Sequence, residues 1–202
     1  MRRVVGIMLV VLLITTAIVT SLVVGYMFRI VDVPNTLLPG TVSCMVEEVV
    51  SQNDDSTTLT KQEVTIKNTG NAQAYIRVKV LTYWQDSKGN IVGSKIDNDL
   101  LDTDKYNNSN WIRKEKTVDG GVESITYYCK TPIDPGKNTP DLLANGKTVV
   151  LGITTTKVDG VTYTYRQVAE IIPEAIQSLP ADAVKSSWGV TLVANGNITA
   201  VN

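Results

Sequence analysis

The segment 65–93 constrains the fold of this chain most, because it alternates polar and apolar residues along stretches that are separated by turns. Ile76, Val78 and Val80 fall on one side of the longest stretch, and a period of two residues is typical of a half-buried β-strand. The interruptions at 68–71 and 86–90 are rich in Asn, Asp, Ser and Gly, which favour turns. The segment therefore predicts strand, turn, long strand, turn and strand.

The rest of the chain repeats this pattern. The other predicted strands are 41–50, 111–116, 122–130, 148–158 and 161–172, with a short strand or extended end at 187–193. Asp159-Gly160 and Asp119-Gly120-Gly121 predict hairpin turns, and 180–185, with a proline at its start, predicts one or two helical turns. Helical crossovers are missing, which favours an all-β antiparallel sandwich of jelly-roll or immunoglobulin-like type over 41–202.

Residues 1–29 form a hydrophobic leader. Arg2 and Arg3 precede a stretch at 4–28 without a charged residue, and about 20 apolar residues suffice to cross a bilayer. The stretch exceeds the core of an ordinary signal peptide and lacks a small-x-small exit. It favours an uncleaved N-terminal transmembrane helix, and a cleaved signal peptide is the alternative.

This leader sets the expected location. Arginines that flank a membrane span stay cytoplasmic, so the membrane is a predicted partner through 4–28. After a linker at 30–40, the domain 41–202 is expected to be extracellular, either held at the cell membrane or secreted after cleavage of the leader.

The composition excludes several function classes. The formal net charge is -1, whereas nucleic-acid binding usually needs a basic face. Histidine is absent, which removes Ser-His-Asp and Cys-His catalysis and His-ligated zinc. Carboxylate-pair hydrolysis remains chemically open, but no pair can be singled out from the sequence. We therefore predict no enzyme, no catalytic or cofactor-binding residues and no cofactor.

The two cysteines, Cys44 and Cys129, have two interpretations. In an exported domain they would form one disulfide across a loop of roughly 85 residues, which would stabilise the fold by about 4 kcal/mol. They would otherwise be two buried free thiols. Sequence separation does not decide between these alternatives, because it does not give the distance between the Cα atoms.

An acidic loop lies at 97–104. Four aspartates gather there, and clustered carboxylates suit Ca²⁺. The spacing lacks the glycine and glutamate of an EF-hand, so we expect a solvated loop and predict no metal site.

Short motifs link this chain to a known group of proteins. They are the segments 64–71, 74–78, 127–128, 135–136, 142–143, 174–177 and 183–184, together with Trp84 ahead of 86–89, Trp111, Thr139 and Trp188-Gly189. In this order they resemble exported bacterial proteins of the TasA/camelysin type and their pilin-like relatives.

The resemblance implies a β-sandwich behind an export segment and a structural role at the cell surface or in the biofilm matrix, often as a fibre subunit. The leader is longer than the cleavable signal peptide common in that group. Some members have been described as metalloproteases, and the lack of histidine and of an H-E-x-x-H motif gives no basis for that activity here.

Two functions follow as expectations. The first is a non-catalytic surface or matrix protein that self-associates or contacts other surface proteins. Unpaired sheet edges can accept a strand from a neighbouring copy, and the segment 30–44 is the expected donor because it is extended and tethered. The alternative is an extracellular module that binds carbohydrate or protein, which would need clustered exposed rings or a polar pocket.

Overall fold

The computed structural model describes residues 40–52, 58–92, 105–114 and 116–201, all within a compact unit that begins at Gly40. The predicted leader at 1–29 and most of the predicted linker lie outside the described residues. Within the described ranges, we find no helix of the length and apolarity that a membrane span requires.

The described residues form strands and a short helix. The elements are β1 (Cys44–Gln52), β2 (Thr58–Asn68), β3 (Ala74–Asp86), β4 (Ile91–Val92), β5 (Trp111–Arg113), β6 (Thr117–Asp119), β7 (Val122–Cys129), β8 (Val149–Val158), β9 (Val161–Gln177), α2 (Ala181–Trp188), β10 (Val190–Leu192) and β11 (Ile198–Val201). Every strand pair is antiparallel. The prediction of an all-β antiparallel fold with a short C-terminal helix is confirmed.

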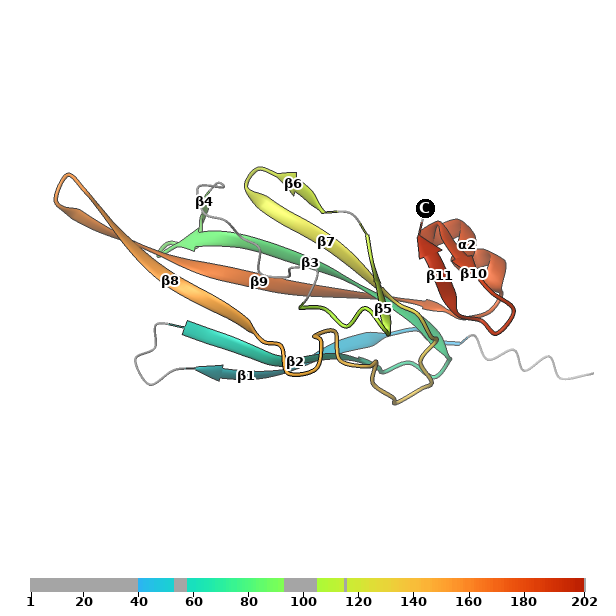
Figure 1. The fold of residues 1–202 in the computed structure, drawn as a ribbon. Coiled ribbons are helices and arrows are strands. Elements are labelled where there is room, and N and C mark those ends of the chain that lie inside the picture. The colour runs from blue at the N-terminus through green and yellow to red at the C-terminus, as the bar shows by residue number, and fades with distance from the viewer. Residues whose placement is uncertain (1–39, 53–57, 93–104, 115, 202) are drawn as a thin grey trace, which may run out of the picture. The chain divides into compact units, whose positions relative to one another are not determined.

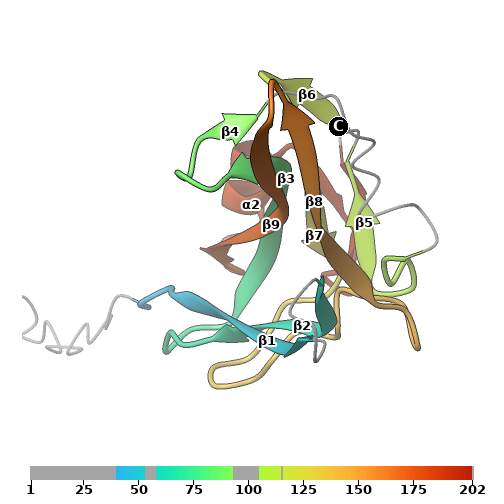
Figure 2. The ribbon, with the colours of Figure 1, turned by 90° about the vertical axis from the view of Figure 1, so that its left-hand side faces the viewer.

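The strand β8 joins two layers. The sheet order is β1-β2-β8-β9-β3-β7-β5, with β4 beside β3 and β6 beside β7. β8 pairs with β2 through Val149–Gly152 and then with β9 through Ile153–Val158. Figure 1 shows β1 and β2 in one layer and β9, β3 and β7 in the other, and Figure 2 shows β8 crossing from one to the other. Because β8 changes partners, one sheet supplies both layers.

The hairpin of β8 and β9 is confirmed at its predicted turn. Asp159 and Gly160 both have positive φ, 50° and 80°, which matches the two-residue turns that suit the twist of paired strands. β9 extends beyond the predicted end at residue 172, through Pro173 to Gln177. A proline has no N–H to donate, so its place in a long strand indicates that one side of β9 is unpaired there.

Two predicted elements have different bounds. Of the predicted strand 111–116, only Trp111–Arg113 forms a strand, β5, and the short strand β6 follows beyond its predicted end; both pair with β7. The helix runs past 185 to Trp188 and takes the first residues of the predicted strand 187–193. Val184 and Trp188, four residues apart on one helical face, are both buried, and Gly189 ends the helix with a φ of 62°.

The main core lies between the two layers. Its buried residues are Val64, Ile66, Ile76, Val78, Val80, Trp111, Ile125, Tyr127, Cys129, Ile133, Leu142, Leu143, Val149, Leu151 and Ala169. This set includes one side of the alternation in β3, as the sequence predicts.

A second cluster buries the C-terminal elements on the opposite face of β3 and β7. Tyr75, Tyr128, Val184 and Trp188 belong to it. Arg77 binds the two parts together, because its guanidinium lies 4.8 Å from the centre of the Trp188 ring and donates to Glu174 at 2.6 Å. The cation–π contact therefore holds α2 against the sheet, and the charge-assisted hydrogen bond to Glu174 on β9 fixes the guanidinium in place.

Tyr127 gives the fold an expected sensitivity to alkaline pH. Burial raises the pKa of Tyr127 to about 12, against the opposing effect of the nearby Arg113 guanidinium. A pKa above the unfolded value of about 10 means that the stabilising contribution is complete below pH 10 and is lost as the pH approaches 12. We expect Tyr127→Phe to reduce the loss of stability between about pH 10 and 12, measured by urea denaturation. Tyr163→Phe, at an exposed tyrosine, is the control and should leave this loss unchanged.

Candidate functional site

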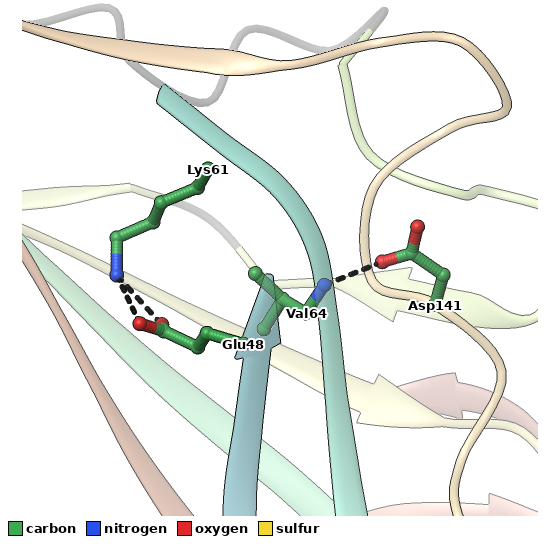
Figure 3. A network of polar contacts seen from close by, with 4 residues as sticks. All are labelled: Glu48, Lys61, Val64 and Asp141. Carbon is green, nitrogen blue, oxygen red and sulfur yellow. Dashed lines mark hydrogen bonds and ion pairs between the residues drawn. The ribbon is translucent and has the colours of Figure 1, made fainter. Parts of the chain in front are cut away.

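One edge of β2 is covered by side chains and backbone of the segment 133–143. Thr139 Oγ1 accepts from Ile66 N at 3.0 Å, and Asp141 Oδ1 accepts from Val64 N at 2.9 Å. The backbone N–H groups of Thr139 and Leu142 donate in return to the carbonyls of β2. Figure 3 shows the Asp141 carboxylate directed at the β2 backbone. This edge therefore has few free groups to offer another chain.

The opposite edge of this layer is open. β1 pairs with β2 along its nine residues and has no other partner among the strands of the described residues. It contains no proline, and Met45 and Val49 on it are 51% and 48% exposed. A long edge with apolar side chains and free backbone groups is the kind that accepts another strand.

The edge of β9 near β1 is less suited to accept another strand. Residues 167–177 of β9 pair with β3, and no strand of the described part of the chain pairs with their other side. β1 and β9 lie close together without forming a ladder. Pro173 interrupts the donors of the β9 edge, so β1 is the better acceptor of the two.

A partly buried ion pair fixes β1 to β2. Lys61 Nζ lies 2.6 Å from both carboxylate oxygens of Glu48 (Figure 3). The Lys61 side chain is 9% exposed and the Glu48 side chain 25%. The pair lies beside the register shift between Val49 and Val50, so it holds β1 where the ladder is irregular.

Removing Glu48 is expected to lower the stability of the fold more than removing Lys61, because Lys61 is the more deeply buried partner. Glu48→Ala leaves a buried ammonium without its partner, and we expect the free energy of unfolding to fall by about 2 kcal/mol. Lys61→Met should cost less, because Glu48 can hydrate and the methionine fills the apolar space. Chemical denaturation of both variants checks the order; a larger loss for Lys61→Met would contradict it.

The end of the expected donor segment 30–44 is already bound within the chain. Ser43 O accepts from Thr69 N at 2.9 Å, and Thr41 O accepts from Asn71 N at 3.0 Å. A Cβ at Gly70 would lie 2.2 Å from Thr41 O, so this close approach requires glycine. Residues 41–44 are therefore not free to leave, and the donor narrows to the part of 30–44 before Thr41.

The two cysteines are not bonded to each other in the structure. Both are free thiols, with Cys44 half-buried on β1 and Cys129 buried in the main core. Burial raises the pKa of both thiols, and the Glu174 carboxylate adds to the rise at Cys44. Both are therefore mainly protonated at neutral pH and poor nucleophiles. The Cys44–Cys129 disulfide of the exported protein stays a prediction.

The acidic loop at 97–104 lies outside the described residues. Elsewhere, in the ranges given above, no three acidic or cysteine side chains come together as metal ligands would. The edge residues Thr139 and Asp141 were missed as functional by sequence reasoning. The sequence feature that could have indicated them is the segment 131–146, which lies between two predicted strands. It contains three prolines and does not alternate polar and apolar residues.

Comparison of the chain with protein-family models, with curated proteins and with solved structures found no match in any of the three.

Proposed function

We propose that this chain is a non-catalytic structural protein of the cell surface or extracellular matrix, which assembles by adding a strand to β1. The proposal includes a β-sandwich of jelly-roll or immunoglobulin-like type and the TasA-like relationship suggested by the motifs. The observation that carries it is the contrast between edges: the β2 edge is capped by Thr139 and Asp141, whereas β1 is open.

Strand addition fits the chemistry of this edge. An added strand gains backbone hydrogen bonds along nine residues and covers the exposed side chains of Met45 and Val49. The donor in this proposal is the segment 30–40 of a second copy. A contact that runs from one region of a copy to a different region of the next is heterologous, and such contacts generate filaments when they do not close into a ring.

The test is electron microscopy of the full chain recovered from the cell surface. We expect filaments, and we expect deletion of 30–40 to abolish them while the far-ultraviolet circular dichroism of the sheet is retained. Single particles at every concentration, or filaments that survive the deletion, would count against this proposal.

The location is part of the same proposal. We place the chain in the cell membrane through 4–28 with its sheet domain outside, or free outside the cell after cleavage. N-terminal sequencing of the recovered protein distinguishes the two: a start at or near Met1 supports the anchor, and a start beyond residue 20 supports the cleaved form.

A further inference from the structure

A pocket of about 480 Å³ lies where β8 leaves β2 and joins β9. It is lined by residues from the ends of β1 and β2, from the bend of β8 at Gly152, and from facing parts of β3 and β9. The volume falls within the range of small-molecule sites. Both layers contribute side chains to it, so the pocket depends on the crossing of β8.

The charges around this pocket are unbalanced. Its charged lining residues are Lys61 and Arg166, and no carboxylate is among the side chains that line it in the described ranges. Lys61 is neutralised by Glu48. Arg166 has no carboxylate partner in the described part of the chain, which leaves one uncompensated positive charge at the pocket.

Arg166 is held in a fixed orientation. Its Nε and Nη2 donate to Gln85 Oε1 at 3.0 and 2.6 Å. The same Gln85 side chain donates through Nε2 to Gly89 O at 3.0 Å. Gln85 therefore orients the guanidinium through these hydrogen bonds. Arg166 Nη1 is left to donate to a ligand. A guanidinium held in this way is suited to bind a carboxylate.

The remaining lining is neutral and mixed. Gln167 Oε1 accepts from Gly152 N at 2.8 Å, which leaves the Gln167 amide donors available. Gln52 and Thr58 add further amide and hydroxyl groups, and the half-buried Tyr83 adds an aromatic ring. Several neutral hydrogen-bonding groups, an aromatic ring and one free positive charge match a polyhydroxylated ligand that carries one negative charge.

We propose that this pocket binds a uronic acid residue of an acidic polysaccharide. Arg166 binds the sugar carboxylate, Gln52 and Gln167 contact its hydroxyls, and the Tyr83 ring packs against its C–H face. A nucleotide is a poorer fit because its phosphates carry more negative charge than one guanidinium offsets. This proposal is argued separately from strand addition at β1, although Gln52 at the end of β1 also lines the pocket.

The test is a titration of the full chain, in mild detergent, with trigalacturonate as the acidic probe and maltotriose as the neutral one. We expect trigalacturonate to bind and maltotriose to bind at least about tenfold more weakly, because the neutral sugar leaves the Arg166 charge unused. Arg166→Gln should weaken trigalacturonate binding by about tenfold or more.

Lys157→Gln is the matched control, because it removes one positive charge from the same hairpin at a residue outside the lining. It should leave binding within about twofold of the original chain. Equal binding of the two sugars, no binding of trigalacturonate, or equal losses for both variants would overturn the assignment. Tyr83→Ala, with its fold checked by circular dichroism, should also weaken binding; unchanged affinity would remove the sugar-stacking role.

Discussion

Replacing Trp111 by alanine is expected to lower the free energy of unfolding by about 4 kcal/mol, the largest effect of a single substitution in this fold. Trp111 is 1% exposed and lies in the main core between the layers. Its removal leaves a large cavity, which the surrounding strands can fill only in part.

The same substitution is expected to expose the second strand edge. Trp111 Nε1 donates to the carbonyl oxygens of Pro140 and Asp141, each at 3.2 Å. These residues belong to the segment that covers β2, so loss of the indole loosens the cover as well as the core. We therefore expect Trp111→Ala to form disordered aggregates in addition to unfolding at lower denaturant.

Trp111→Phe separates the two contributions. It retains most of the packing and loses the indole N–H, so it should cost about 1–2 kcal/mol. Urea denaturation followed by far-ultraviolet circular dichroism is the measurement, because the signal does not depend on the tryptophan that is removed. A loss below about 2 kcal/mol for Trp111→Ala would show that the core closes around the gap.

Local patterns were sufficient to predict the longest strands of the fold, whereas β11 (Ile198–Val201) was not predicted. β3 and the β8–β9 hairpin follow from alternation and from Asp159-Gly160, because both signals act within a few residues. The extension of β9 through Pro173 could not be predicted in this way. A proline is tolerated there only because that side of β9 is unpaired, and the pairing of a strand is decided by distant parts of the chain.

The open edge of β1 and the pocket also could not be predicted from local sequence patterns. Asp141 caps Val64 across 77 positions of sequence, and Arg166 meets Gln85 across 81. Sequence periodicity gives the face on which a side chain lies, but not which strand faces it. The number of predicted strands was enough to expect unpaired sheet edges in general. That β1 is the open edge could be known only from the observed strand pairing.

Strand addition at β1 can be tested without changing its pairing to β2. In the double variant Met45→Lys, Val49→Lys, both new ammonium groups lie on exposed positions. In the ladder, Val49 stands opposite Glu63 and Met45 stands opposite Lys67. In an antiparallel pair, a lysine opposite Glu63 is favourable and a lysine opposite Lys67 is unfavourable, each by less than about 1 kcal/mol. Because the two effects oppose each other, the stability of the monomer should change by less than about 1 kcal/mol.

The same double variant should raise the protein concentration needed for assembly by about tenfold or more. Lysines on an edge strand oppose strand addition because the incoming strand must bury or displace their charge. The control is Val118→Lys, Val158→Lys, which adds the same charge at exposed apolar positions of β6 and β8. Sedimentation at increasing concentration measures both. Equal inhibition by the two double variants would assign the effect to net charge, whereas loss of assembly in the β1 variant alone would locate the contact on the open edge of the first strand.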